Sequence, residues 1–239
     1  MKLFLSGYGK MGKMIEELAK GRGWEIVGYA DITCPENYAT APNADVCIDF
    51  SGVGALAHLA EYIRRTKTPL VSGTTGLSSP DFALLEELSV IVPVIWSANY
   101  STGVAVLRRI LRDYGPVLQD WDKEIVELHH NQKVDAPSGT AKLLLQQLDP
   151  EGTASVAHGR EGICGKRPQG QIGVFSLRGG TVAGEHQVHF FGEDETLVLT
   201  HRAASRRIFA AGAIRAAEAL AGNPVGYYTL DELIFKDGR

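Results

Sequence analysis

Hydrophobic and polar positions repeat with two alternating periods over residues 1–100. Short apolar runs typical of buried strands occupy residues 2–6, 25–30, 44–50, 69–72 and 90–96. Between them lie segments with apolar residues at helical spacing, 11–20, 53–65 and 81–88. Strands that alternate with helices form βα units, which build a doubly wound parallel sheet. The pattern predicts an α/β fold of the Rossmann type for residues 1–100.

The pattern changes after residue 100. A helix is expected at 102–114, and strands follow at 124–128, 172–177, 185–191 and 196–202. The last two strands are separated by Gly192-Glu193-Asp194-Glu195, which indicates a hairpin. We expect a second, α+β domain at 101–206, with an open mixed sheet covered by helices on one face. An uncovered sheet face often packs against another subunit, so the protein is expected to be an oligomer.

The chain then returns to the first domain. A helix is predicted from Ser205 to about Leu220, and Thr229 opens a last short helix with a capping box. Residues 207–239 are therefore expected to complete the first domain. Arg206, at the start of the long helix, is a candidate to bind a substrate carboxylate, with a solvated arginine as the alternative.

A glycine-rich loop directly follows the first predicted strand and leads into the first helix. It reads Gly7-Tyr8-Gly9-Lys10-Met11-Gly12, the GxGxxG spacing that lets a backbone turn tightly and approach a pyrophosphate. Asp31 ends the second strand, about 20 residues later, where a ribose-binding acid is expected. Its carboxylate would repel a 2′-phosphate, which favours NADH. Lys10 and Lys13 leave NADPH open, and for Asp31 a plain turn residue is the alternative.

Two further polar segments follow predicted strands of the same sheet. In a doubly wound sheet, ligands lie beyond the carboxyl ends of the strands, so these segments are candidate walls of a nicotinamide pocket. Plain turn chemistry is the alternative for each. Their residues are Gly73, Thr74 and Thr75, and Ser97, Ala98, Asn99 and Tyr100.

The segment 124–148 combines a strand, a polar loop and a helix start. Residues 124–128 alternate charged and apolar side chains and deliver His129 and His130 to the end of the strand. Successive strand residues point to opposite sides, so only one of these histidines is expected to face the pocket. Lys133 follows in the loop, where its ammonium can attract an anion or supply a proton.

The helix after this loop has a start suited to anions. Pro137 prevents a helix from running through the loop, and Ser138 is the expected N-cap. The N–H groups of Gly139 and Thr140 can then hold a carboxylate or phosphate. The whole set suits a small anionic substrate that needs protonation, and ordinary polar loop residues are the alternative. Zinc is less favoured, because the two histidines are adjacent and no cysteine or third histidine lies nearby.

Composition narrows the classes of function. The net charge of -4 gives no general attraction to nucleic acid, and no apolar run approaches the length of a membrane span or a signal peptide. Three cysteines without a Cys-x-x-Cys pair fit a reducing compartment, so we expect a cytoplasmic protein.

One long stretch resembles the signature of the dihydrodipicolinate reductase family of lysine and diaminopimelate synthesis. It runs from Glu127 to Ala141 and reads ELHHNQKVDAPSGTA. Shorter family segments recur in order along the rest of the chain. They are the Gly7–Gly12 loop, Asp49-Phe50-Ser51, Gly73-Thr74-Thr75-Gly76, Asn99-Tyr100-Ser101, Arg178-Gly179-Gly180, Gly184-Glu185-His186 and Ser205-Arg206.

This resemblance implies a function and a set of roles. The implied enzyme is a tetramer that transfers hydride from NADH or NADPH to a cyclic dicarboxylate, 4-hydroxy-tetrahydrodipicolinate, without a catalytic metal. By the resemblance, His129 is the acid/base and Lys133 the second proton donor. His130 and Arg206 match positions near the substrate, and Ser138, Gly139 and Thr140 match the carboxylate-binding helix start. The matched cofactor positions are Gly7 to Gly12, Asp31, Gly73 to Thr75 and Ser97 to Tyr100.

Two alternatives from other classes are also considered. One is a dinucleotide-sensing regulatory protein with a dead active site, whose mark would be loss of the His129 and Lys133 pair. The other is a dehydrogenase for a different amino or hydroxy acid, which a substrate screen would reveal.

Overall fold

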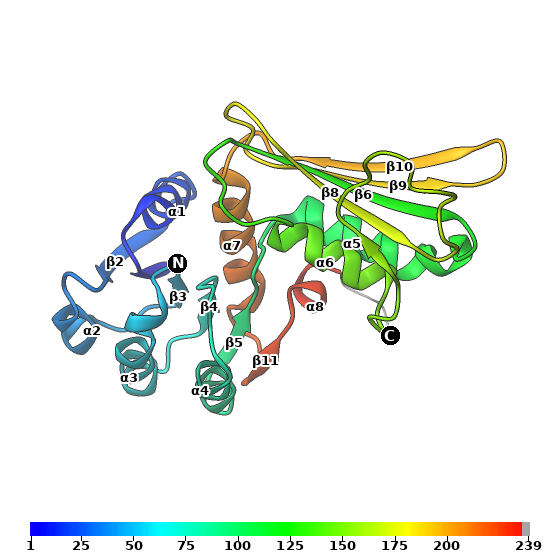
Figure 1. Ribbon diagram of the computed structural model, residues 1–239. Coiled ribbons are helices and arrows are strands. Elements are labelled where there is room, and N and C mark those ends of the chain that lie inside the picture. The colour runs from blue at the N-terminus through cyan, green and yellow to red at the C-terminus, as the bar shows by residue number, and fades with distance from the viewer. Residues whose placement is uncertain (236–239) are drawn as a thin grey trace. The chain divides into compact units, whose positions relative to one another are not determined.

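The computed structural model describes residues 1–235 and divides the chain into two compact units, each drawn in Figure 1. Unit 1 comprises Met1–Thr102 and the segment from Arg207 onward, and unit 2 comprises Gly103–Arg206. The end of the predicted return segment, residues 236–239, lies outside the described part of the chain.

Unit 1 is built on a parallel sheet of six strands in the order β11-β5-β4-β3-β1-β2. These strands are β1 (Lys2–Ser6), β2 (Glu25–Ala30), β3 (Val46–Asp49), β4 (Leu70–Ser72), β5 (Pro93–Trp96) and β11 (Gly226–Tyr228). The chain adds β2 on one side of β1 and β3, β4 and β5 on the other, so the strand order reverses beside β1. The predicted Rossmann-type fold is confirmed.

Helices cover both faces of this sheet. Helix α1 (Lys10–Lys20) packs beside α7 (Arg207–Leu220), and α8 (Leu230–Ile234) contacts α7. On the opposite face, α3 (Leu56–Thr66) contacts both α2 (Glu36–Thr40) and α4 (Ser79–Ser89), as Figure 1 shows. A 3₁₀ turn, Val53–Ala55, leads into α3. Phe4 of the sheet stacks on Tyr62 of α3 at 4.2 Å between ring centroids, and both are fully buried.

Among the predicted strands of this unit, the one at 90–96 begins furthest from its expected position. The apolar run 90–96 was expected to be a strand throughout, but β5 begins only at Pro93. The N–H groups of Val90, Ile91 and Val92 donate to carbonyls of Glu87 and Leu88 at the end of α4. Since these donors complete the helix end, they are not available for a sheet.

Unit 2 has a mixed five-stranded sheet in the order β10-β9-β6-β8-β7. The strands are β6 (Asp122–His129), β7 (Val156–Ala157), β8 (Ile172–Arg178), β9 (Glu185–Phe191) and β10 (Thr196–Arg202). The central strand β6 pairs in parallel with β8 and antiparallel with β9. Strands β9 and β10 form the predicted hairpin, closed by a bond from the Gly192 N–H to the Glu195 carbonyl.

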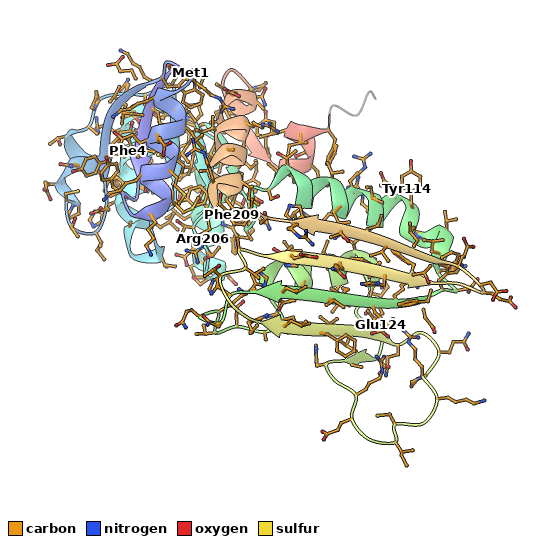
Figure 2. The ribbon with its side chains drawn as sticks, turned by 90° about the horizontal axis from the view of Figure 1, so that it is seen from above. Met1, Phe4, Tyr114, Glu124, Arg206 and Phe209 are labelled. Carbon is orange, nitrogen blue, oxygen red and sulfur yellow. The ribbon has the colours of Figure 1, made fainter. Side chains whose placement is uncertain are left out.

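Only one face of this sheet is covered by helices in the described part of the chain. Helices α5 (Thr102–Tyr114) and α6 (Gly139–Leu148) lie on the same side, with the 3₁₀ turn Gly115–Leu118 after α5. Figure 2 views the strands from the open side. Strand alternation places Leu177, Phe191 and Val198 on that side, and they are 48%, 41% and 43% exposed.

The long loop between β7 and β8 is anchored to the sheet by ion pairs. Arg160 and Arg167 both bind Glu124 of β6, at 2.9 and 3.2 Å, and Arg167 also binds Asp122 at 2.5 Å. Figure 2 labels Glu124 at the place where this loop runs out from the sheet.

Gly212 of α7 provides a test of packing in unit 1. A Cβ at this position would lie 1.7 Å from the carbonyl oxygen of Tyr100. Alanine is the better helix former by about 1 kcal/mol, but the clash dominates. We expect Gly212→Ala to lower the free energy of unfolding by about 1–3 kcal/mol, measured by urea denaturation.

Glu218→Ala on the same helix is the matched control, since its side chain is 42% exposed. It should change the free energy of unfolding by no more than about 0.5 kcal/mol. A stability for Gly212→Ala equal to that of the control would show that Tyr100 is not held against α7.

Candidate functional site

A cavity of about 250 Å³ opens at the carboxyl ends of the first strands of unit 1. This is where the strand order reverses, the place at which open α/β sheets bind ligands. Three segments line the cavity, each following a different strand: Gly7, Tyr8 and Gly9 after β1, Asp31, Ile32 and Thr33 after β2, and Phe50, Ser51, Gly52, Gly54 and Ala55 after β3.

Each of the three glycines of the loop is required for a different structural reason. Gly7 has a φ of 90°, a region that side chains disfavour. At Gly12, a Cβ would lie 2.1 Å from the Gly7 carbonyl oxygen, so the helix and the turn touch there. At Gly9, a Cβ would meet nothing within 4 Å. The space over Gly9 is therefore open to a ligand. Lys10 is exposed at the start of α1, and Met11 is half-buried.

Asp31 offers one carboxylate oxygen to the cavity. Its Oδ1 accepts bonds from the Thr33 N–H at 2.7 Å and the Thr33 hydroxyl at 2.6 Å. These bonds hold the pKa of Asp31 below its usual range, so the group is ionised. No bond to Oδ2 is found within residues 1–235, which leaves this oxygen for the hydroxyl groups of a ligand. The residues thus fit the adenosine end of a dinucleotide.

Tyr8 packs against the neighbouring strand at the cavity mouth. Its ring stacks on Tyr29 at 4.0 Å between centroids, and its hydroxyl donates to Glu16. That hydrogen bond raises the pKa of Tyr8, so the phenol stays neutral. Tyr8 therefore contributes an apolar ring surface.

The sequence reading missed a buried carboxylate that joins the strand ends. Asp49, fully buried at the end of β3, accepts hydrogen bonds from four hydroxyl groups on three strands and their loops. The donors are Ser6 at 2.8 Å, Ser51 at 2.5 Å, Ser72 at 2.8 Å and Thr74 at 2.8 Å. An acidic residue ending an otherwise apolar strand was the available signal.

The candidate nicotinamide walls divide into exposed and buried residues. Thr75 and Ala98 are exposed, while Gly73, Ser97 and Asn99 are half-buried. Thr74 is 4% exposed and binds Asp49. Tyr100 is 1% exposed, and its hydroxyl donates to the Ser72 carbonyl at 2.7 Å, so this side chain belongs to the core.

In unit 2, strand register gathers polar side chains on the helix-covered face. Glu127 and His129 are two positions apart on β6, so they point to the same side. Arg178 of β8 lies opposite His129, and His186 of β9 lies opposite Glu127. The rings of His129 and His186 are 5.2 Å apart in an edge-to-face arrangement.

Glu127 is a fully buried carboxylate whose negative charge is balanced by Arg178. Arg178 donates to both of its oxygens, at 2.8 and 2.9 Å. Burial alone raises the pKa of Glu127, but hydrogen bonds from Arg178, Ser176 and His129 outweigh it and lower this pKa to about 2. Removing one partner from such a buried pair costs about 3–5 kcal/mol.

The predicted proton donors have distinct surroundings. His129 Nδ1 lies 2.5 Å from Glu127 Oε2, and its side chain is 11% exposed. Burial lowers the pKa of His129, and Glu127 acts in the opposite direction. His130 follows the strand and is half-buried. Lys133 pairs with Asp135 at 2.7 Å, with 19% of its side chain exposed.

Ser138 caps α6 as predicted, but it is almost fully buried. Its hydroxyl accepts from the Ala141 N–H at 3.2 Å and lies 3.0 Å from His186 Nε2. Its own N–H donates to Glu127 Oε1 at 3.1 Å. Ser138 therefore fixes the helix start, while Gly139 is exposed and Thr140 half-buried in the first turn. Arg206 is exposed at the end of unit 2.

The sequence reading did not assign roles to Glu127, Arg178 or His186. Glu127 was available as the charged residue two positions before His129, on the same strand face. Arg178 and His186 were visible only within the recurring family segments. Burial lowers the pKa of His186 to about 4, so this histidine is neutral at pH 7.

A second cavity of the described chain lies apart from the predicted site residues. A larger cavity of unit 2, about 420 Å³, includes Arg108, Arg112 and Lys123 in its lining but none of the predicted site residues. Within residues 1–235, no group of three or more histidine, cysteine, aspartate or glutamate side chains is placed to hold a metal ion. No helix over the same range is long and apolar enough to cross a membrane.

Comparison with known families matches both units. Residues 1–100 match the model for dihydrodipicolinate reductase, N-terminus, and residues 103–234 match the model for dihydrodipicolinate reductase, C-terminus. The chain belongs to the dihydrodipicolinate reductase family. The resemblance seen in the sequence is thereby confirmed. The boundary between the matched ranges, near residue 100, coincides with a boundary between the units, whereas the second range also includes residues 207–234, which belong to unit 1.

Individual members of the family are similar over their full length. The chain is 43% identical to the 4-hydroxy-tetrahydrodipicolinate reductase of Staphylococcus aureus (strain JH9) and 44% identical to that of Staphylococcus saprophyticus. Each alignment covers 98% of this chain and 100% of the relative. Among solved structures, the dipicolinate-bound dihydrodipicolinate reductase from Paenisporosarcina sp. TG-14 superposes with a TM-score of 0.77 at 20% identity, covering 98% of this chain and 99% of that one.

Two glycine substitutions separate the roles within the loop. Gly12→Ala places a Cβ against the Gly7 carbonyl and should lower the free energy of unfolding by about 1–3 kcal/mol. Gly9→Ala meets nothing in the protein and should stay within about 0.5 kcal/mol of wild type, yet weaken dinucleotide binding because its methyl fills the space over the loop. Denaturant titration and fluorescence titration with NADH measure the two effects. Unchanged NADH affinity in Gly9→Ala would place the pyrophosphate elsewhere.

Proposed function

We propose that this protein reduces 4-hydroxy-tetrahydrodipicolinate to tetrahydrodipicolinate, in lysine and diaminopimelate biosynthesis, with NADH or NADPH as reductant. The observation that supports it most is the pairing of a histidine, oriented by a buried carboxylate, with a capped helix start in one short segment. Full-length relatives that carry this enzyme name give the same reading. A sensor or a dehydrogenase for another acid is not favoured.

The chemistry required matches these residues. When bound, the dihydronicotinamide ring supplies a hydride to the substrate carbon. The 4-hydroxyl group leaves as water and one proton is consumed in each turnover, so the site needs a proton donor. His129 is the proposed donor and Lys133 the second one. Lys133 must exchange its present partner, Asp135, for substrate to act in this way.

The substrate's carboxylates are assigned to the start of α6. We assign one to the first-turn N–H groups of Gly139 and Thr140, where the helix dipole favours an anion. Ser138 is proposed to act on the substrate carboxylate only by fixing the start of α6, because its own polar groups bind inside the protein. His130 and Arg206 are proposed as further substrate contacts. The dipicolinate ligand of the Paenisporosarcina enzyme is a dicarboxylate of the same kind.

The cofactor is assigned to the glycine loop and its neighbours. The family uses a pyridine nucleotide, and the ionised Asp31 favours NADH because it would repel a 2′-phosphate. The proposed contacts are Gly7, Tyr8, Gly9, Lys10, Met11, Gly12 and Asp31, with Gly73, Thr75, Ser97, Ala98 and Asn99 around the nicotinamide. The side chains of Thr74 and Tyr100 are buried and are proposed to support this wall from within the protein. Residues 1–100 with 207–239 form the proposed cofactor domain, and 101–206 the substrate domain.

We also propose a cytoplasmic homotetramer. The open face of the unit 2 sheet, with Leu177, Phe191 and Val198 partly exposed, is the surface that a second copy would cover. Sedimentation equilibrium should give four times the monomer mass of 25.8 kDa. A monomer at micromolar concentration would contradict this assembly.

Activity is tested by coupling to the preceding reaction. Substrate is generated in place from pyruvate and aspartate semialdehyde, and oxidation of NADH and NADPH is followed in parallel. We expect rapid, protein-dependent oxidation, faster with NADH. The double variant His129→Ala/Lys133→Ala should lose turnover by more than about 10²-fold, while its NADH affinity stays near wild type. Loss of NADH binding in this variant would contradict the division of roles.

A further inference from the structure

We infer that Glu127 is the positioning residue of this site: its two carboxylate oxygens hold His129 in one tautomer and fix the start of α6 at the same time. This role rests on the proposed function, since it concerns how His129 delivers a proton. One buried carboxylate would thus position both the proton donor and the anion-binding start of the helix.

The first oxygen selects the tautomer of His129. Glu127 Oε2 lies 2.5 Å from Nδ1 of the ring. An ionised carboxylate can only accept a hydrogen bond, and Glu127 is ionised because its pKa is about 2. The proton of the neutral ring must therefore be on Nδ1. Nε2 is left as the atom that takes up and releases the catalytic proton.

The surroundings of Nε2 fit this assignment. A Cβ on Gly184 would lie 3.1 Å from Nε2, so the missing side chain leaves space there. Gly184 has a φ of 154°, which side chains rarely adopt. The chain therefore keeps a gap beside the ring atom that would meet substrate.

The second oxygen acts on the helix. Glu127 Oε1 accepts the Ser138 N–H at 3.1 Å, and the Ser138 hydroxyl caps α6 through Ala141. His186, which is 4% exposed, supports the same hydroxyl at 3.0 Å. Because a carboxylate is rigid, displacement of the helix start would also displace the bond to His129. Arg178 holds both oxygens and so fixes the plane of the carboxylate.

The charged groups around His129 allow the role of Glu127 to be measured through the pKa of His129. The groups that face it are Glu127 on its own strand, Arg178 on β8, His186 on β9 and Lys133 in the following loop. Burial is the largest influence and lowers the pKa of His129, and the two cations lower it further. Glu127 raises it. Neutralising Glu127 must therefore shift the titration of His129 to lower pH.

The deciding experiment is ¹⁵N NMR of histidine-labelled full-length protein without substrate. The His129 signals are assigned by their loss in His129→Ala. Wild type should show a protonated Nδ1 and an unprotonated Nε2 above the pKa of the ring. Glu127→Gln, which keeps the shape and removes the charge, should lose this preference and titrate at lower pH. A protonated Nε2 in wild type overturns the inference, even if Glu127→Gln does not fold.

Glu124→Gln is the matched control. Glu124 is on the same strand and is also bound by two arginines, but it points to the other face. It should leave the tautomer and the titration of His129 unchanged. An equal change in both variants would mean that any loss of a β6 carboxylate disturbs the ring, which also overturns the inference.

Kinetics complete the test. In Glu127→Gln, kcat should fall by about 10²-fold or more, and the basic limb of its pH profile, where a proton donor is lost, should move to lower pH, while the KM for NADH stays near wild type. An unshifted pH profile at wild-type kcat contradicts the positioning role. A wild-type protein that shows the Nδ1–H tautomer yet does not turn over the cyclic substrate refutes the proposed function and leaves the role of Glu127 standing.

Discussion

A carboxylate without exposed surface must be paired, and in unit 2 this constraint falls on Glu127. Its partner Arg178 comes from β8, and the pairing holds only in the register that places Glu127 opposite Ser176. A slip by one residue would turn Glu127 to the open face and separate it from Ser138. The register of the central strand and the position of α6 thus depend on the same charge.

Unit 1 relies on a different constraint, the close approach of backbone to backbone. Gly12 lies against the Gly7 carbonyl, and Gly212 lies against that of Tyr100. These contacts bring α1 and α7 onto the sheet more closely than any side chain would allow. They leave the N-terminal end of α1 facing the cavity at the strand ends, where a phosphate group is favoured. The proposed nucleotide site is therefore shaped by contacts between backbone atoms rather than by side chains.

Local patterns in the sequence were enough for most helices and strands, because each depends on neighbours within a few residues. The helix start at Ser138 and the β9–β10 hairpin are examples. Contacts between distant segments were not accessible in that way. Arg178 is 51 residues from Glu127, and His186 is 48 from Ser138. The strand predicted at 90–92 was wrong for a related reason. The apolar residues there suit a strand, but their N–H groups complete the end of α4.

Asp49 determines which hydroxyl groups can donate hydrogen bonds beside the cavity of unit 1, the proposed cofactor site. The hydroxyl groups of Ser51 and Thr74 donate their hydrogen bonds to this carboxylate. Their oxygens can therefore only accept a hydrogen bond from a ligand. Ser6 is in the same state, so the proton between it and Tyr38 belongs to the phenol. Ser51 lines the cavity, and Asp31 is there as well. Both are acceptors, so under the proposed cofactor assignment this part of the cavity favours a ligand edge rich in donors, as a ribose with two free hydroxyls is, over one whose hydroxyl has been esterified.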